Sequence, residues 1–317
     1  MKQNLKSILS WLAIAVLGYL LISVLISAGI FNLYHVQVMQ TIGINIILAI
    51  GLNLIVGFSG QFSLGHAGFM AIGAYAVAII GLRMPSYGGF FIAMLVGVIL
   101  AGLVALVVGI PTLRLKGDYL AISTLGVAEI IRILLVNGGT LTNGAAGILG
   151  IPSFTTWPLV YIFVVLSLVL AMNFLRSPLG RNTMAVREDE IAAESVGVNT
   201  TKVKVGAFVF GAMLAAVAGS LQAGYVGTVM PKDFAFMTSV NVLIIVVLGG
   251  LGSMTGTVVA AVVLGLLNMV LQDYSEIRMI IYALALILIM IFRPGGLLGT
   301  KELTLSNLFN KSKKEVK

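Results

Sequence analysis

Ten long apolar runs follow one another along this chain, and one long charged stretch interrupts them. Charged residues make up 9% of the sequence, whereas a soluble domain averages about 25%. This pattern excludes a water-soluble globule and predicts an all-α, polytopic membrane protein with about ten (eight to ten) transmembrane helices. The predicted spans are roughly 8–30, 36–57, 67–82, 89–110, 119–136, 157–175, 203–227, 239–251, 254–272 and 277–292.

Two of the predicted spans, 67–82 and 239–251, are shorter than the roughly 20 residues that a straight helix needs to cross the hydrocarbon core. We therefore expect some spans to be half-helices or broken helices. The first run, 8–30, follows Lys2 and Lys6 and superficially resembles a signal peptide. It exceeds the usual apolar region of roughly 7–15 residues, so we interpret it as an uncleaved span.

Lysine and arginine are distributed asymmetrically among the predicted loops. If the N-terminus is cytoplasmic, all but four of the 19 Lys and Arg residues fall in cytoplasmic segments or at their edges. The positive-inside rule then predicts that both termini are cytoplasmic, and it explains the net charge of +8 without nucleic acid as a partner. We expect one transmembrane domain over 1–300 and a basic, lipid-facing cytoplasmic tail over 301–317.

Much of the glycine lies in two apolar runs, Gly51–Tyr75 and Val246–Val259. Unwound backbone at membrane depth is tolerated only inside protein or beside a water-filled cavity, so such paired breaks point to a transport pathway. Close helix packing is the alternative explanation. The spacing of Gly211, Ala215 and Gly219 along one span illustrates it.

The charged stretch Arg176–Lys204 is expected to form a short helix outside the bilayer between two spans. Glu188, Asp189 and Glu190 suit a first helical turn, where carboxylates meet the positive end of the helix dipole. Gly197 suits a left-handed C-cap, and Asn199 offers an N-cap for the following span. We expect another protein to contact this helix.

Enzymatic and metal-binding motifs are missing from the sequence. It has no cysteine, no H-E-x-x-H and no G-x-S-x-G, and its two histidines, His35 and His66, have no metal-ligand spacing. It also lacks G-x-x-x-x-G-K-[ST], so any ATP that drives transport would bind another polypeptide. We predict no catalytic residue, no metal site and no cofactor bound by this chain.

Polar residues near or within the spans are the candidates for a transport pathway. Glu129 and Arg132 lie three residues apart on one helical face, either as a structural ion pair or as substrate contacts. Gln61, Ser63 and His66 either hydrogen-bond the broken backbone or line the pathway. Asn143 lies in a loop that is either a plain turn, a docking surface or the pathway mouth.

Several stretches together resemble the branched-chain amino-acid permeases of ATP-binding-cassette importers, specifically the LivM-like subunit. They span most of Gly51–Gly299 and read GLNLIVGFSGQFSLGHAGFMAIGAY, RLKGDYLAISTLGVAEIIR, LTNGAAGILGIP, SPLGRNTMAVREDEIAAESVGVNTTKVK, VVLGGLGSMTG and IFRPGGLLG. The resemblance implies a prokaryotic cell membrane, a homologous LivH-like permease, two cytoplasmic ATPases (LivG-like and LivF-like) that bind ATP and magnesium, and an extracytoplasmic amino-acid-binding protein.

The same resemblance implies that the charged stretch couples the permease to an ATPase. The cytoplasmic signature of such permeases, E-A-A-x-x-x-G, is matched by Ala192, Ala193 and Gly197, whereas Ile191 occupies the position of the Glu and Glu190 lies one residue early. The coupling candidates are Arg187, Glu188, Asp189, Glu190, Ala192, Ala193, Glu194 and Gly197.

The resemblance and the charged stretch together favour a permease subunit that imports leucine, isoleucine or valine by alternating access. A related permease for urea or short amides is one alternative. An autonomous ion-coupled carrier is another, although such a carrier needs no docking helix and usually has more intramembrane carboxylates. The sequence leaves open whether the second permease is a homologue or a second copy of this chain.

Overall fold

The computed structural model describes residues 16–29 and 31–271, together with 280, 284, 287, 296, 297 and 299. The predicted tail 301–317 and most of the predicted span 277–292 lie outside the described residues. The elements are a helix Val16–Ser27, α2 (Leu33–Asn53), a π-helix (Leu54–Phe58), α3 (His66–Arg83), α4 (Tyr87–Thr112), α5 (Asp118–Val136), a 3-10 turn (Gly144–Ala146), β1 (Ile148–Leu149), α6 (Trp157–Arg176), α7 (Pro178–Glu188), α8 (Glu190–Ser195), α9 (Thr200–Val226), β2 (Thr228–Val229), a 3-10 turn (Pro231–Phe234), α10 (Phe236–Gly249) and α11 (Met254–Val270).

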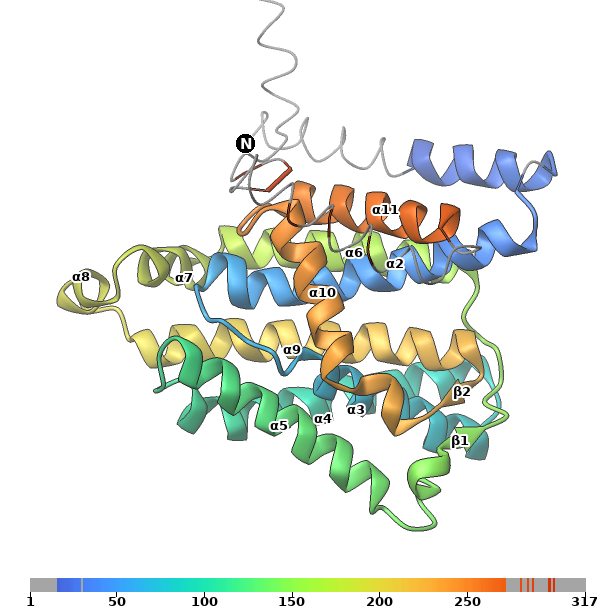
Figure 1. Cartoon of the computed structure of the whole chain (residues 1–317), viewed down its shortest axis with the longest axis horizontal. Helices are drawn as coiled ribbons and strands as arrows, with labels where there is room; N and C mark the ends of the chain where they lie inside the picture. Colours follow the sequence, from blue (N-terminus) through green and yellow to red (C-terminus); the bar gives the residue numbers. More distant parts are fainter. Residues whose placement is uncertain are drawn as a thin grey trace, which may run out of the picture.

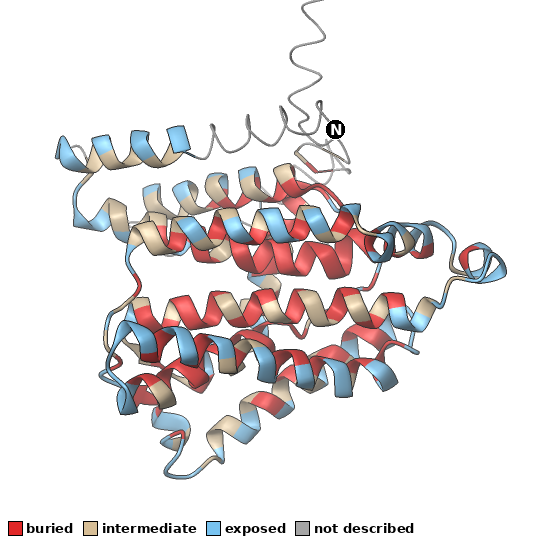
Figure 2. Ribbon diagram, turned by 180° about the vertical axis from the view of Figure 1, so that it is seen from behind, coloured by how far each residue is buried: buried red, intermediate tan, exposed pale blue. Residues whose placement is uncertain are grey.

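The long helices lie roughly alongside one another, and α9 runs through the middle of the bundle (Figure 1). It packs against α3 and α4 on one side and against α2 on the other, while α2 also contacts α6 and α11. Helix α10 crosses these helices steeply (Figure 1). Buried residues concentrate on α2, α3 and α9, whereas the outer helices are more exposed (Figure 2). Many of the exposed side chains are large and apolar. Such an apolar exterior suits a lipid environment.

Six helices are long and apolar enough to cross a membrane, and the pair α10–α11, bent by 119°, makes a seventh if it is one span. The all-α, polytopic class is therefore confirmed, with six or seven candidate spans among the described residues; the predicted total of about ten stays a prediction, because most of 277–292 and part of 8–30 lie outside them. The predicted short span 239–251 is one arm of the bent pair. The other short span, 67–82, is a continuous helix preceded by buried, non-helical backbone.

Polar caps explain where the helices begin. The side chains of Asn32, Ser86, Ser177 and Ser253 each accept a hydrogen bond from a backbone N–H in the first turn of α2, α4, α7 and α11. Asn199 does the same for α9, as predicted. These bonds satisfy donors that a helix start otherwise leaves without a partner.

Small residues on α9 allow its backbone to approach two other helices closely. A Cβ atom added at Gly211 would lie 2.6 Å from the carbonyl oxygen of Gly51 in α2, and one added at Gly219 would lie 1.9 Å from that of Met70 in α3. Ala215, between them, is fully buried. The close-packing interpretation is therefore confirmed for this stripe of α9.

We expect Gly219→Ala to destabilise the protein, because its new methyl group would press on the backbone of α3, and overpacking of this kind costs about 1–3 kcal/mol. Gly126→Ala in α5 is the matched control, since a Cβ there meets nothing within 4 Å and alanine is favoured over glycine in a helix by about 1 kcal/mol. Thermal unfolding of the purified protein in detergent compares them. Equal midpoints for the two variants would contradict the close approach.

Candidate functional site

Helices α7 and α8 form a compact element between two long helices, α6 and α9. We call residues 178–197 the coupling element, after the role that the resemblance implies for them. Helix α8 projects beyond the end of the bundle (Figure 1). The predicted helix start is wrong in one respect: Glu188 ends α7 and is not part of the first turn of α8. Asp189 separates the two helices, and its Oδ1 accepts hydrogen bonds of 2.9 Å from the N–H groups of Ile191 and Ala192. This aspartate therefore fixes the start of α8.

Gly197 ends α8 as predicted. Its φ of +88° lies in the left-handed region that favours glycine. Its N–H donates to the carbonyl oxygen of Glu194 (2.9 Å), and the next N–H, of Val198, donates to that of Ala193 (3.1 Å). This pair of bonds is a Schellman motif, completed by the contact of Val198 with the cluster that contains Ala193.

The coupling element has an outward face and an inward face. Ile191 and Val196, two β-branched apolar side chains of this element, are 78% and 80% exposed. Ala193, in contrast, is buried with Val186 and Val203. From the sequence, Ile191 was noted only as a departure from the signature, and Val196 was missed. Sequence alone could not show that both are exposed, because exposure depends on how α8 is oriented on the bundle. Glu188, Asp189, Ala192 and Glu194 are also exposed.

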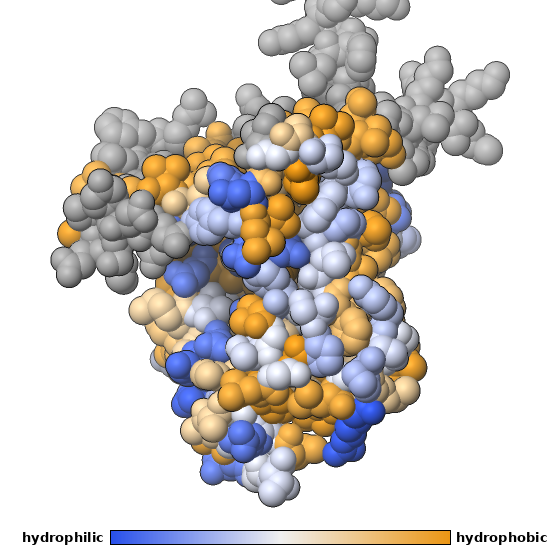
Figure 3. All heavy atoms as spheres, turned by 90° about the vertical axis from the view of Figure 1, so that its right-hand side faces the viewer, coloured by the Kyte–Doolittle hydropathy of each residue, from blue (hydrophilic) through white to orange (hydrophobic). Residues whose placement is uncertain are grey.

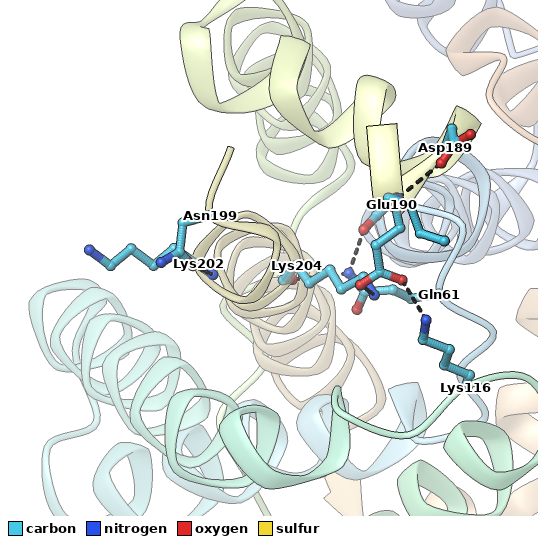
Figure 4. Close-up of polar contacts among 9 residues, drawn as sticks. Gln61, Lys116, Asp189, Glu190, Asn199, Lys202 and Lys204 are labelled. Carbon is cyan, nitrogen blue, oxygen red and sulfur yellow. Dashed lines mark hydrogen bonds and ion pairs between the residues drawn. The ribbon is translucent and has the colours of Figure 1, made fainter. Parts of the chain in front are cut away.

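Glu190 lies on the inward face between two lysines (Figure 4). Its carboxylate pairs with Lys204 Nζ of α9 at 2.5 Å and with Lys116 Nζ of the α4–α5 loop at 3.3 Å. The hydrogen bond from Lys204, followed by the charges of both lysines, lowers the pKa of Glu190. Glu190 thus joins the coupling element to two neighbouring segments instead of facing outward.

Basic residues gather at the end of the bundle that carries the coupling element. They are Arg114, Lys116, Arg176, Arg181, Arg187, Lys202 and Lys204. Near the other end, which carries β1 and β2, the described segments contain Arg83, Lys232 and, one turn before the end of α5, Arg132, which is paired with Glu129. Figure 3 views this second end, where polar and apolar side chains are interspersed. The bundle therefore has a strongly basic end and a weakly basic end.

The segment 59–65 of the first glycine-rich run is non-helical and largely buried, with Gln61 and Ser63 only 3% and 2% exposed. Hydrogen bonds replace those of a helix. Gln61 N–H donates to Ile55 O (3.0 Å), Leu64 N–H to Thr124 Oγ1 (3.0 Å), and Gly65 N–H to Ser63 Oγ (3.4 Å). Gln61 Nε2 also donates to Lys204 O (3.1 Å). These polar side chains hold the broken backbone in place.

His66 begins α3 and is 1% exposed. Its Nε2 lies 3.0 Å from Leu48 O in α2. The adjacent Ala67 N–H donates to Ser239 Oγ of α10 at 3.0 Å. The start of α3 is therefore tied to two other helices. Among the described residues, Nδ1 of His66 and Oε1 of Gln61 are buried without a hydrogen-bond partner.

Asn53 connects the two glycine-rich runs, and sequence reasoning missed it. Its Nδ2 donates to Ser253 O (3.0 Å) and Thr257 Oγ1 (2.8 Å), and its Oδ1 accepts from Gly252 N–H (3.0 Å). The side chain is fully buried. An amide within an apolar helical run was the available sequence signal, but its partners lie about 200 residues away.

Glu129 and Arg132 form an ion pair on α5, with Arg132 Nε 2.9 Å from Glu129 Oε2. Their side chains are 44% and 28% exposed, so the pair lies on the flank of the bundle. Asn143 has a φ of +57° and donates to Gly147 O at 2.8 Å at the β1 end. The structure therefore brings Gln61, Ser63 and His66 together but not all six pathway candidates.

A hollow of about 440 Å³ lies at the weakly basic end. It is lined by Ile79, Leu82, Arg83, Thr140, Leu141, Asn143, Ile148 and Leu149. Across the described part of the chain, no three His, Asp or Glu side chains gather in a way that could hold a metal ion.

The ion pairs of Glu190 give a pH-dependent prediction. Because the pKa of Glu190 is lowered in the folded protein, its pairs stabilise the fold above the ordinary carboxyl value of 4.5. This contribution is lost as the pH falls through the lower folded-state pKa. We expect Glu190→Gln to reduce the free energy of unfolding at pH 7 by about 1 kcal/mol. Glu194→Gln, at an exposed position of the same helix, is the control.

Thermal unfolding in detergent at pH 7 and at pH 3–4 tests this prediction. The difference between the wild-type protein and Glu190→Gln should shrink at the lower pH, whereas Glu194→Gln should match the wild type at both. A pH-independent difference would contradict the ion-pair explanation.

Comparisons with known proteins agree with the resemblance. Residues 34–292 match the family described as branched-chain amino acid transport system / permease component. The chain is 40% identical to LivM of Salmonella typhimurium over 63% of this chain and 56% of that protein, and 39% identical to LivM of Escherichia coli over 67% and 58%. LivH of Salmonella typhimurium is 30% identical over 63% and 65%. No solved structure matches.

The matched part spans little more than half the length of these LivM relatives, all of which are named as high-affinity branched-chain amino acid transport permeases. The family match covers most of the chain, including both glycine-rich runs and the coupling element. Its description and the apolar helices agree on a multi-pass membrane protein that is a transport component and not an enzyme. This chain belongs to the branched-chain amino acid permease family.

Proposed function

We propose that this chain is the LivM-like permease subunit of an ATP-binding-cassette importer for leucine, isoleucine and valine in a prokaryotic cell membrane. The observation that carries the proposal is the coupling element: a capped, protruding helix at the basic end of a membrane bundle, within the family match. A carrier that works alone has no use for such an element.

The outward face of α8 suits docking to an ATPase subunit. Ile191 and Val196 offer two exposed apolar contacts, and Glu188, Asp189 and Glu194 surround them with negative charge. An apolar centre with a charged rim is typical of specific interfaces. We propose that separate LivG-like and LivF-like ATPases bind ATP and magnesium, and that their closure moves this helix.

The basic end of the bundle is then cytoplasmic, in agreement with the positive-inside rule. The weakly basic end, with the hollow beside Arg83 and Asn143, faces outward to an amino-acid-binding protein. A homologous LivH-like permease completes the pathway, a pairing supported by the similarity of this chain to both LivM and LivH relatives.

Radiolabelled leucine uptake tests the substrate. Cells that lack this chain should lose uptake, the gene should restore it, and excess unlabelled urea should not compete. Isoleucine and valine should compete, because they share the aliphatic side chain and the zwitterionic backbone of leucine. Unchanged leucine uptake in cells without the chain would contradict the amino-acid assignment and direct the same assay to urea.

Substitution of Gly197 tests the coupling element. Valine at a φ of +88° is strained, so Gly197→Val should disrupt the end of α8 and abolish uptake while the protein still inserts. Gly197→Asn is the matched control, because asparagine tolerates this conformation. Apart from this backbone strain, a Cβ at position 197 meets nothing within 4 Å in this chain. A clash of the new side chain itself would therefore arise with the docked partner. Normal uptake by correctly inserted Gly197→Val would contradict the assignment.

A further inference from the structure

Arg187 was expected to help contact an ATPase, but its guanidinium points into the permease. It lies in the last turn of α7, and its Nη1 donates to the carbonyl oxygen of Gly57 at 2.6 Å. Its side chain is 31% exposed. Glu188, its neighbour, is the nearest acidic group, with 3.8 Å between Nε and Oε1, and is 79% exposed. The strongest contact of Arg187 is therefore with the first glycine-rich run.

Gly57 lies in the π-helix that ends α2. The wide turn is closed by Ser59 N–H donating to Leu54 O (3.1 Å) and Gln61 N–H donating to Ile55 O (3.0 Å). The carbonyl groups at the end of any helix lack intrahelical donors and carry the negative end of its dipole. A cationic donor such as Arg187 suits this position, and a hydrogen bond from a charged group is stronger than one between neutral groups.

Two glycines leave room for the arginine side chain. A Cβ atom added at Gly60 would lie 3.2 Å from Cγ of Arg187, and one added at Gly252 would lie 2.6 Å from its Nη1. Gly252 belongs to the bend between α10 and α11 in the second glycine-rich run. Thus one side chain of the coupling element contacts both runs.

The two runs are themselves joined. Asn53, one turn before Gly57, accepts a hydrogen bond from Gly252 N–H and donates to Ser253 O. The end of α2 and the α10–α11 bend therefore form one hydrogen-bonded unit, which we call the break unit. Glu190, by contrast, connects α8 to Lys116 and Lys204, which lie outside this unit.

We propose that Arg187 is a positioning residue that transmits movement of the coupling element to the break unit, and so links ATP hydrolysis to the opening of the pathway. This inference rests on the proposed function. Among the side chains of the coupling element, that of Arg187 hydrogen-bonds the break unit, and the lack of a Cβ at Gly60 and Gly252 leaves room for it.

The transporter reconstituted in liposomes with its ATPases and binding protein tests the proposal. We expect Arg187→Ala to lower leucine transported per ATP hydrolysed by about tenfold, as for the loss of a hydrogen bond to a charged group. ATP hydrolysis and subunit assembly should remain near the wild-type level. Arg187→Lys should recover part of the loss, because lysine keeps one charged donor but lacks the planar fork.

Arg181→Ala is the matched control, since Arg181 lies on the same helix as Arg187 but donates to Arg176 O at the end of α6, at 2.7 Å. It should transport leucine as the wild type does. Arg187→Ala overturns the proposal if leucine transported per ATP is unchanged, or if hydrolysis and assembly fall in parallel with uptake. The latter would assign Arg187 to the ATPase contact.

Hydrogen–deuterium exchange separates this inference from the substrate assignment. In the assembled wild-type complex, nucleotide should change exchange at residues 250–253 and 57–60, whatever the substrate is. The change should persist in Arg181→Ala and disappear in Arg187→Ala. Its persistence in Arg187→Ala would overturn the inference. If wild-type complexes show the change in exchange but do not transport leucine, the substrate assignment is wrong and the role of Arg187 stands.

Discussion

The hydrogen bonds of Asn53 are the interaction on which the rest of the bundle depends. Two chain segments of the bundle leave helical geometry, at 59–65 and at 250–253, and their buried backbone groups need hydrogen-bond partners other than those of a helix. Asn53 satisfies groups of the second break from the end of the helix that precedes the first. One buried side chain therefore ties the second break to the end of the helix that precedes the first.

Close packing makes this arrangement possible. Helix α9 approaches α2 at Gly211 and α3 at Gly219, so that the backbones are in direct contact. Ser220 Oγ of α9 then donates to Gly73 O of α3 at 3.1 Å, and Gln61 of the first break reaches Lys204 O at the start of α9. The glycines therefore serve both interpretations that the sequence left open: those of α9 permit close approach, and those at 57, 60 and 252 leave room for the broken backbone and for Arg187.

The sequence predicted elements with a local signal and missed contacts between distant segments. Apolar runs and polar caps gave the positions of most described helices, and the left-handed Gly197 and the N-cap Asn199 followed from residue type alone. The roles of Asn53 and Arg187 could not be predicted in this way, because their partners are about 200 and 130 residues distant. Nor could spacing show which carboxylate of the coupling element points inward, since Asp189 interrupts the helix and resets its faces.

This interruption also explains how the chain departs from its family signature. With Asp189 as the N-cap, Glu190 becomes the first residue of α8 and turns toward Lys204 and Lys116, while Ile191 turns outward. A carboxylate one position early is thus used for attachment inside the permease, and an apolar side chain occupies the exposed position.

If α8 docks on an ATPase as proposed, the centre of that contact is apolar and the charges lie around it. Removing water from apolar groups favours binding without the desolvation penalty of a buried charge. The inward charges are then free to hold α7 and α8 on the bundle, so that force applied at Ile191 and Val196 reaches the breaks through groups that stay attached.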